Sequence, residues 1–409
     1  MSTETTIIGQ GMAGFSCAVT LKNRNHLIRV LSQNGGATSV SSGSWDFGPT
    51  SLSSSQNLQD CLKSAQWQTI LKAILSESLP TLDFDTISSS MKEITQALEP
   101  SLPMTVRLER SMDLPTTDGS IKRTFVAQKY QAAFELSQDS PRNIGVLHSS
   151  QWRYPSQPLS EQWQKSPLGL SKKWELKTLG SWPWGDDVPL AHLATRLEHD
   201  RAFEATFLEL VVKTIKTSPV DLLILPPLCL SAAQWQKWEQ SIGCRIAEPL
   251  CTIEPIAGER LRRGIATILN QLKIPMVTQS LHHTEISNSP TDQMIVATGK
   301  LFGGGIKLGY QSVEETALGL PLFIQRSSAP IRYRWELDWT DHGFATDQPW
   351  AKLGLWVNEN WQPVDETKTI CSPHVRACGS AVGGVDYGRH GVGLGLMAVM
   401  GRLCGFASS

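Results

Sequence analysis

Short apolar runs alternate with amphipathic stretches from the start of the chain, a pattern typical of an α/β fold. Residues 5–8 are β-prone, residues 12–23 carry the small and apolar side chains of a packed helix, and residues 27–31 have the composition of a second strand. This βαβ order implies a parallel sheet, because parallel neighbours need a crossover connection. We expect later apolar runs at residues 294–298 and 375–378 to join the same sheet.

The rest of the chain is predicted from the same patterns. Helices are expected near residues 57–79, 87–98, 191–216, 231–241 and 259–272, and further strands near residues 123–127, 222–225 and 275–279. Residues 151–190 are rich in proline, serine and tryptophan and lose regular periodicity, so no continuous core element is expected there. Residues 320–365 are β-prone and aromatic.

The composition excludes several classes of protein. Hydrophobic residues make up 40% and charged residues 18% of the 409 residues, which suits about two or three domains with a large core. A formal net charge of −1 offers no basic face for nucleic acid. The eight cysteines include no C-x-x-C pair that would support a zinc or iron–sulfur site. Neither a signal peptide nor an apolar run of ~18 residues is present, so we expect a cytoplasmic protein.

A nucleotide-binding turn directly follows the first predicted strand. Gly9, Gly11 and Gly14 form the motif G-x-G-x-x-G between that strand and the first helix. The first glycine permits the turn, the second lets the backbone approach a phosphate, and the third lets the helix pack on the strand. The helix N-terminus adds free N–H groups and a positive dipole end. The motif predicts phosphate binding; the alternative is a tight packing turn without a ligand.

The second strand lacks the acid that usually binds an adenosine ribose. This Asp or Glu normally lies roughly 20 residues beyond the motif. Here the strand ends in Leu31-Ser32-Gln33, and no acidic residue occurs between Thr5 and Trp45. Ser32 or Gln33 could bind a ribose, but less strongly than a carboxylate. The simplest interpretation is a ligand with a phosphate and no adenosine, so we expect FMN, with FAD as the second choice.

Two later glycine-rich segments are candidates for the other half of a flavin site. The strand near residues 294–298 stops at Gly299, and Gly303–Gly305 follow; an ordinary βα turn is the alternative. Nine glycines fall between residues 379 and 405, although glycine is costly in a helix. Close approach to a flat ligand explains them, with close helix–sheet packing as the alternative. N–H groups near Gly391–Gly395 could then face the flavin pyrimidine carbonyls and stabilise its reduced anion.

These motifs resemble those of a flavoprotein family, the FMN-containing subunits of anaerobic glycerol-3-phosphate dehydrogenase. The residues that carry the resemblance are the nucleotide turn, Ser41-Ser42-Gly43-Ser44-Trp45-Asp46, Gly258-Glu259-Arg260-Leu261, Ala297-Thr298-Gly299 with Phe302 and Gly304-Gly305, and Gly379-Ser380 with Gly383-Gly384 and Asp386. The S-S-G-S-x-D and G-S-x-x-G-G-x-D motifs are the more specific signals. The chain departs from the family at Tyr387-Gly388-Arg389-His390 and in residues 151–190.

The resemblance implies an FMN subunit that works beside a catalytic FAD subunit. An iron–sulfur subunit would attach the pair to the cytoplasmic face of the inner membrane. The complex would oxidise sn-glycerol 3-phosphate to dihydroxyacetone phosphate and pass electrons to the quinone pool, with fumarate or nitrate as final acceptor. A self-sufficient FAD enzyme of the fumarate-reductase type and a non-redox scaffold are the alternative functions.

The site prediction combines the motifs with this resemblance. The expected cofactor-binding residues are Gly9, Gly11, Gly14, Ser42, Gly43, Ser44, Gly299, Gly379, Ser380, Gly383, Gly384, Asp386 and Gly391. Ser380 stands where many flavoproteins carry an acid that holds the ribityl chain. Arg389 and His390 could balance an anionic flavin or form a solvated pair, and Arg260 could contact phosphate or lie on a helix surface. The sequence assigns no catalytic residue and no metal ligand.

The expected fold is a Rossmann-like two-dinucleotide-binding flavoprotein fold with an inserted second region. We expect the flavin-binding domain to comprise residues 1–100, 256–310 and 366–409, and an inserted or cap region to comprise residues 101–255 and 311–365. Five of the 14 tryptophans lie in the proline-rich stretch: Trp152, Trp163, Trp174, Trp182 and Trp184. They are interpreted either as a partner interface or as a loop folded over its own domain.

Overall fold

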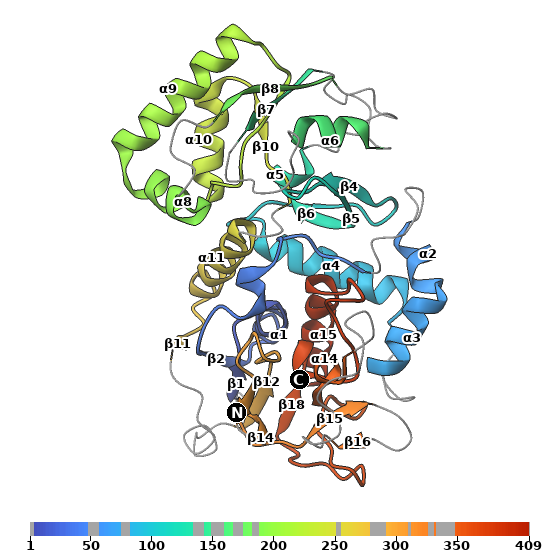
Figure 1. Cartoon of the computed structure of the whole chain (residues 1–409). Helices are drawn as coiled ribbons and strands as arrows, with labels where there is room; N and C mark the ends of the chain where they lie inside the picture. Colours follow the sequence, from blue (N-terminus) through green and yellow to red (C-terminus); the bar gives the residue numbers. More distant parts are fainter. Residues whose placement is uncertain are drawn as a thin grey trace. The chain divides into compact units, whose positions relative to one another are not determined.

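The chain forms two compact units in the computed structural model (Figure 1). The structure describes residues 4–47, 57–74, 82–133, 143–148, 159–166, 175–181, 188–250, 255–278, 292–309, 312–325, 331–332 and 348–408. The first unit comprises residues 1–38, 45–98 and 265–409, and the second comprises residues 39–44 and 99–264. Residues 311–365 therefore fall in the first unit, whereas the sequence analysis grouped them with the inserted region.

A parallel sheet of five strands forms the centre of the first unit. The strand order is β11-β2-β1-β12-β18. The strands are β1 (Glu4–Ile8), β2 (Leu27–Ser32), β11 (Met276–Thr278), β12 (Gln293–Val296) and β18 (Val375–Ala377). Ile7 pairs with Val30 on one side and with Ile295 on the other. The predicted α/β fold with a parallel sheet is confirmed, and the strand predicted at residues 275–279 joins the sheet at its edge.

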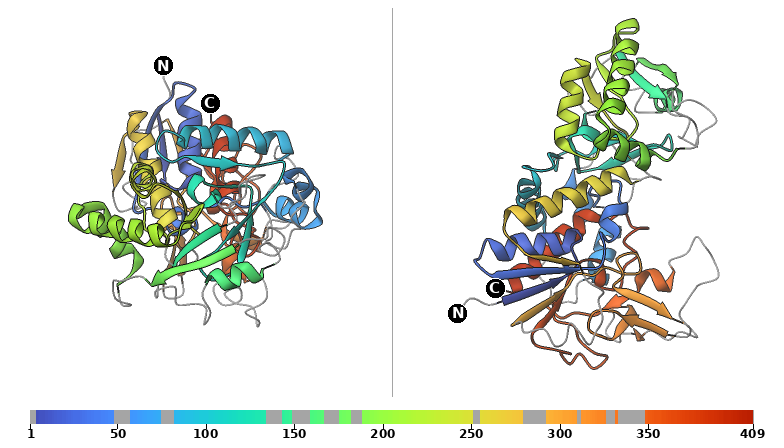
Figure 2. Two further views of the ribbon diagram at one scale, coloured as in Figure 1. Left: turned by 90° about the horizontal axis from the view of Figure 1, so that it is seen from above. Right: turned by 90° about the vertical axis from the view of Figure 1, so that its left-hand side faces the viewer.

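Two helices on the sheet pack unusually close together. Helices α1 (Met12–Lys22) and α15 (Leu394–Ala407) lie side by side (Figure 2). A Cβ added to Gly401 would lie 2.1 Å from the Ala13 carbonyl oxygen, and one added to Gly405 would lie 3.0 Å from Thr20 Cβ. Only glycine permits this approach. Close packing, which was the alternative interpretation, therefore explains these two C-terminal glycines.

The remaining elements of the first unit surround this core. The helices are α2 (Leu58–Lys63), α3 (Ala65–Ile74), α4 (Phe84–Leu98) and α14 (Pro349–Lys352), with the short turns η1 (Ala37–Val40) and η2 (Gly379–Ala381). Strands β13 (Ile306–Gly309) and β14 (Ser312–Glu315) form a hairpin. Strands β15 (Leu322–Gln325), β16 (Ile331–Arg332) and β17 (Gly354–Leu355) form a small antiparallel sheet. The boundary between the two units falls within turn η1.

The second unit is built on its own four-stranded parallel sheet. Its order is β10-β9-β7-β8, from β7 (Asn143–His148), β8 (Glu175–Ser181), β9 (Leu222–Ile224) and β10 (Arg245–Ala247). Two antiparallel pairs are added, β3 (Met104–Val106) with β6 (Val126–Gln128) and β4 (Met112–Pro115) with β5 (Ile121–Thr124). The helices are α5 (Lys129–Ala132), α6 (Leu159–Lys165), α8 (Leu190–His199), α9 (Arg201–Thr217), α10 (Ala232–Ile242) and α11 (Ile256–Gln271), within which the unit boundary falls.

Two predictions for the second unit need correction. The single helix expected at residues 191–216 is two helices, because Asp200 accepts the N–H groups of Ala202 and Phe203 and so starts a new helix. The stretch expected to lack regular elements contains α6 and the edge strand β8. An edge strand needs few apolar residues, so its pattern is weak in sequence.

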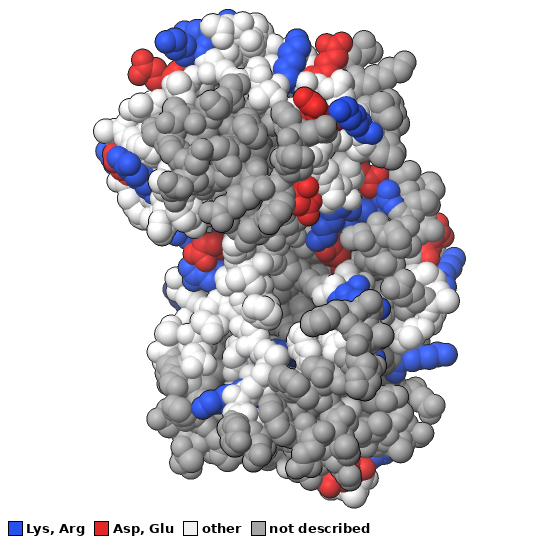
Figure 3. Space-filling model, in the orientation of Figure 1, with Lys and Arg blue, Asp and Glu red and all other residues white. Residues whose placement is uncertain are grey.

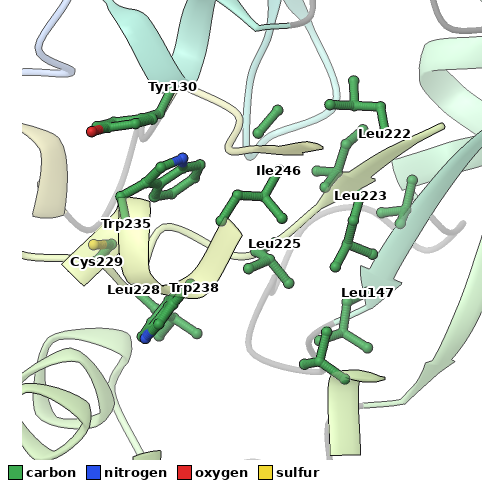
Figure 4. Packing of buried hydrophobic residues seen from close by; sticks show 14 of the residues in the cluster. Tyr130, Leu147, Leu222, Leu223, Leu225, Leu228, Cys229, Trp235, Trp238 and Ile246 are labelled. Atoms are coloured by element: carbon green, nitrogen blue, oxygen red, sulfur yellow. The ribbon is translucent and has the colours of Figure 1, made fainter. Parts of the chain in front are cut away.

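Large aromatic side chains fill the core of the second unit. The Tyr130 ring lies against the Trp235 indole with centroids 4.3 Å apart, beside leucines from the sheet (Figure 4). Trp163 is fully buried in the same core. The interface interpretation is therefore wrong for Trp163, which covers its own domain. The other four tryptophans of that prediction, Trp152, Trp174, Trp182 and Trp184, lie outside the described residues.

Candidate functional site

Three strand ends bring glycine turns to one edge of the first unit's sheet. Gly9 follows β1 with φ +117°, Gly299 lies beyond β12 with φ +78°, and Gly379 lies beyond β18 with φ +68°. A Cβ added to Gly299 would lie 3.4 Å from Ser380 Oγ, so the last two turns meet. Parallel α/β sheets bind ligands at this carboxyl edge. The structure thus brings together predicted site residues that lie up to 370 positions apart in the sequence.

The three glycines of the nucleotide turn have different structural reasons. A Cβ on Gly14 would lie 1.9 Å from the Gly9 carbonyl oxygen, and one on Gly9 would lie 2.3 Å from the Ala297 carbonyl oxygen. Packing alone therefore requires glycine at both positions. Around Gly11, the single neighbour found among the described residues is Thr38 Oγ1, 3.2 Å from an added Cβ. Gly11 leaves room for a ligand, as the motif predicts.

The N-terminus of α1 is prepared for an anion. Gly11 is the N-cap and provides no side-chain cap, and its φ of −68° is open to any residue. The Met12 N–H donates to Thr38 Oγ1 at 3.0 Å. The next N–H groups of the first turn have no carbonyl partner within the helix and carry its positive dipole end. Thr38 was missed in the sequence because nothing in its local pattern marks it.

The end of β2 meets the turn beyond β12. Gln33 Oε1 lies 3.3 Å from a Cβ added to Gly304, and Ser32 is buried at the last position of the strand. Thr298 Oγ1 is buried and has no hydrogen-bond partner among the described residues. Polar side chains of Ser32, Gln33 and Thr298 therefore stand where the motif expects a nucleotide.

The segment before α15 is ordered by its own contacts. A Cβ on Gly383 would lie 2.9 Å from the Gly354 nitrogen, and Gly384 has φ +94°. Asp386 Oδ1 accepts the Arg389 N–H at 3.1 Å, which closes a turn. Gly391, with φ +58°, donates its N–H to the Gly388 carbonyl. These residues fix the course of the chain toward α15 rather than identifying a ligand by themselves.

Helix α15 begins at an uncapped glycine. Its N-cap is Gly393, which has no side-chain cap, and no described atom lies within 4 Å of a Cβ added there. The first turn contains no acidic side chain. The open N-terminus thus lies where the sequence predicted N–H groups for a flavin. Arg389 is exposed and His390 is partly buried nearby in the sequence.

Lys300 is a buried cation that the sequence analysis missed. Its Nζ donates to the carbonyl oxygens of Ala351 and, at 2.8 Å, Val385. It also lies 5.0 Å from the centroid of the Tyr387 ring. Burial lowers the pKa of Lys300 to about 7, although the Asp386 carboxylate raises it in part. A lysine directly after the A-T-G turn was the available signal.

The Ser42-Gly43-Ser44 motif lies in the second unit. Gly43 has φ +79°, and a Cβ there would lie 2.5 Å from Gln128 Nε2, so packing and conformation both require glycine. The hydroxyls of Ser42 and Ser44 are 2.9 Å apart, and Lys122 Nζ donates to both. The predicted contact of these residues with a flavin stays a prediction.

Arg260 is neither a phosphate ligand nor a helix-surface residue. It is 2% exposed and forms an ion pair with Glu248. It also donates to Gln128 Oε1 at 2.6 Å and to the Cys229 carbonyl at 2.8 Å. Burial alone would lower the pKa of Arg260, but the Glu248 carboxylate raises it overall. Arg260 therefore stabilises the interior of the second unit, and both sequence interpretations of it are wrong.

The surface and ligand inventory adds little further chemistry. On the face shown in Figure 3, Lys and Arg side chains are interspersed with Asp and Glu. Within the described part of the chain, no group of three or more His, Cys, Asp or Glu side chains is placed to hold a metal ion. Of the helices described, none combines the length and apolarity that crossing a membrane requires.

Comparisons with known proteins point to flavin binding. The model of a family described as FAD binding domain matches residues 4–76 and 258–396, more than half of the chain. A protein named as a probable subunit of anaerobic glycerol-3-phosphate dehydrogenase, from two strains of Halobacterium salinarum, is 26% identical over 171 residues. That match covers 41% of this chain and only 38% of the relative.

Solved structures resemble the chain only distantly. The 3-ketosteroid Δ1-dehydrogenase of Sterolibacterium denitrificans is 9% identical with a TM-score of 0.40, covering 100% of this chain and 98% of that one. The L-amino acid deaminase of Proteus myxofaciens is 12% identical with a TM-score of 0.21, covering 79% and 50%. Neither likeness carries a conclusion about function.

Proposed function

Since the chain belongs to the FAD binding domain family and is a flavin-dependent oxidoreductase, we propose that it is the flavin subunit of an anaerobic glycerol-3-phosphate dehydrogenase. The complex oxidises sn-glycerol 3-phosphate to dihydroxyacetone phosphate and delivers electrons to quinone, with fumarate or nitrate as final acceptor. The name of the Halobacterium salinarum relative and the motifs around Ser42 and Gly379 support this specific role.

The proposed cofactor is FAD. The family match favours FAD, so the sequence-based preference for FMN is not supported. That preference rested on the missing acid after β2. A serine hydroxyl or an amide can also bind a ribose, and Ser32 and Gln33 occupy the end of β2 beside Gly304. The lack of a carboxylate is therefore compatible with an adenosine.

The first unit's own residues fit such a group. Gly11 and the N-terminus of α1 would hold phosphate, and Gly299 and Ser380 would line the next part of the site. The open N-terminus of α15 at Gly393 would place N–H groups toward a carbonyl-bearing ring. A bound flavin supplies the hydride and electron transfer. Gly9, Gly14 and Gly379 let strands, turns and helices approach closely enough to orient these groups.

The open side of Gly11, in a motif whose other two glycines are fixed by packing, carries the proposal most directly. Acid release of the flavin followed by chromatography tests the cofactor: stoichiometric FAD supports the proposal, and FMN contradicts it. Reduction of the flavin by sn-glycerol 3-phosphate in the purified complex tests the substrate. A chain reduced only by succinate or oxidised only by fumarate would favour the fumarate-reductase type instead, and a colourless chain would favour a scaffold.

The partners belong to the same proposal. A catalytic FAD subunit would accept electrons with this chain, and an iron–sulfur subunit would link both to the cytoplasmic face of the membrane and to quinone. Co-purification of the three chains, followed by release of this chain from membranes when the iron–sulfur subunit is deleted, is the expected result. Membrane attachment of this chain alone would contradict it.

A further inference from the structure

Three donor groups converge in the second unit, at a place distinct from the turns described for the first. Lys122 Nζ lies 3.3 Å from Ser42 Oγ and 3.2 Å from Ser44 Oγ, and the two hydroxyl oxygens are 2.9 Å apart. Lys122 comes from β5, 80 residues beyond Ser42. We call these three side chains the Lys122 cluster.

The backbone that carries the two serines is held rigidly. Gly43 takes a left-handed conformation, so both side chains reach the same ammonium group. Gln131 Nε2 donates to the Ser42 carbonyl at 2.9 Å. A Cβ added to Gly258 in α11 would lie 2.6 Å from the Ser41 carbonyl oxygen, so the helix backbone presses on the segment. The cluster is therefore preorganised, which reduces the ordering cost of binding.

The hydrogens of the cluster favour an external acceptor. The two serine oxygens accept from the ammonium, so their own hydrogens point away from Lys122. One of these hydrogens can satisfy the Ser42–Ser44 bond, and the other needs an acceptor outside the cluster. Ser44 is buried, whereas Ser42 and Lys122 are partly exposed, so a small ligand can reach the group. A positive charge with outward hydroxyl donors suits a phosphate oxygen.

A buried acceptor lies beside these donors. Gln131 Oε1 has no hydrogen-bond partner among the described residues, although the same amide donates to Ser42. Leaving a buried acceptor without a partner costs about 1–3 kcal/mol, so a ligand that supplies a hydroxyl would be favoured there. Phosphate acceptor and hydroxyl donor together describe a phosphorylated polyol.

We propose that the Lys122 cluster binds the phosphate group of a polyol phosphate, with Gln131 beside it for a hydroxyl. Naming sn-glycerol 3-phosphate as that ligand rests on the proposed function, whereas phosphate binding itself does not. The same chemistry would also recognise a phosphate of the flavin, and the experiment separates the two sources.

The test measures equilibrium binding of inorganic phosphate and of sn-glycerol 3-phosphate to the flavin-loaded full chain. Lys122→Met is expected to weaken both affinities about tenfold or more, because it removes a charged donor. Ser44→Ala keeps the charge and is expected to weaken them about two- to fivefold. Lys213→Met, at an exposed lysine on α9, is the matched control and should bind both ligands like the wild type.

Flavin absorbance and the thermal unfolding midpoint are recorded for each variant. Weaker phosphate binding with full flavin content supports the proposal. Loss of flavin with unchanged phosphate affinity assigns the cluster to the cofactor and overturns it, as does unchanged affinity in both Lys122→Met and Ser44→Ala. If Lys122→Met fails to fold, Ser44→Ala decides alone. Inorganic phosphate binding that depends on Lys122 in a chain that never oxidises sn-glycerol 3-phosphate would retain this site and reject the proposed function.

Discussion

The side-chain ammonium of Lys300 donates a hydrogen bond of 2.8 Å to the backbone carbonyl of Val385. A second bond to the Ala351 carbonyl ties the turn beyond β12 to α14 as well. Two carbonyl oxygens and the Tyr387 ring replace much of the water that an ammonium group would otherwise hold. Such partners stabilise the charge only in part, and burial lowers the pKa of Lys300 to about 7.

The first prediction concerns stability and pH at Lys300. Its folded pKa of about 7 lies below its ordinary value of 10.5. Between these values the unfolded chain binds more protons, so the free energy of unfolding rises with pH and is lost again as pH falls toward 7. Relative to Lys300→Met, the wild type should gain up to about 1.4 kcal/mol per pH unit from about pH 7.5 to 9.5. Chemical denaturation across this range provides the measurement.

An exposed lysine provides the control for that experiment. Lys307 lies on β13 and is exposed. Lys307→Met should follow the wild-type pH profile. A stability difference between wild type and Lys300→Met that stays constant with pH would show that Lys300 keeps its charge in the folded chain throughout this range.

The second prediction concerns the buried pair of Arg260 and Glu248. Removing one member of a buried ion pair leaves the other charge unpaired, which typically costs about 3–5 kcal/mol. Arg260→Met should therefore destabilise the chain by about this amount without changing flavin affinity in the folded fraction. The double variant Arg260→Met with Glu248→Met should recover part of the loss. Normal stability with lost flavin in Arg260→Met would instead restore the phosphate-contact interpretation.

The third prediction concerns Trp163. Its side chain is fully buried in the core of the second unit. Trp163→Ala should lower the free energy of unfolding by about 3–5 kcal/mol, because it removes a large apolar side chain and leaves a cavity. Trp163→Phe should retain most of the stability. A stable Trp163→Ala chain that loses only its partner subunits would return this residue to an interface role.

The sequence predicted the parts of the fold whose signal is local. Strands such as β1 and β12 are continuous apolar runs, and the glycine motif identifies the turn at Gly9. Strand β8 was missed because an edge strand carries few apolar residues. The helix break at Asp200 was missed because an aspartate inside an amphipathic pattern has no local mark that it caps a helix.

The site was predictable only where one motif contains it. Lys300 is buried by Ala351 and Val385, which lie 51 and 85 positions away, and no sequence pattern reports that contact. Glycine density near the C-terminus was ambiguous for the same reason. Gly405 permits packing against Thr20, whereas Gly393 has no described neighbour within 4 Å of an added Cβ. Composition cannot separate these two roles, because both require the same missing side chain.

The final prediction separates ligand contact from packing within the nucleotide turn. Gly11→Val adds a side chain into space bordered by Thr38 Oγ1 at 3.2 Å, at a φ of −68° that valine can adopt. The chain should fold, with an unfolding midpoint of the flavin-free form within a few degrees of the wild type, about 1 kcal/mol of stability. Flavin affinity should fall by about a hundredfold or more, since the branched side chain occupies the phosphate position.

Gly14→Ala is the matched control, because its Cβ would lie 1.9 Å from the Gly9 carbonyl oxygen. It should destabilise the fold by about 1–3 kcal/mol, with flavin lost only as the chain unfolds. Absorbance at the flavin band after gel filtration, with unfolding curves of the flavin-free chains, distinguishes the two variants. Retention of stoichiometric flavin by folded Gly11→Val would mean that the open side of Gly11 faces solvent, and the phosphate would have to be sought at another helix N-terminus of the first unit.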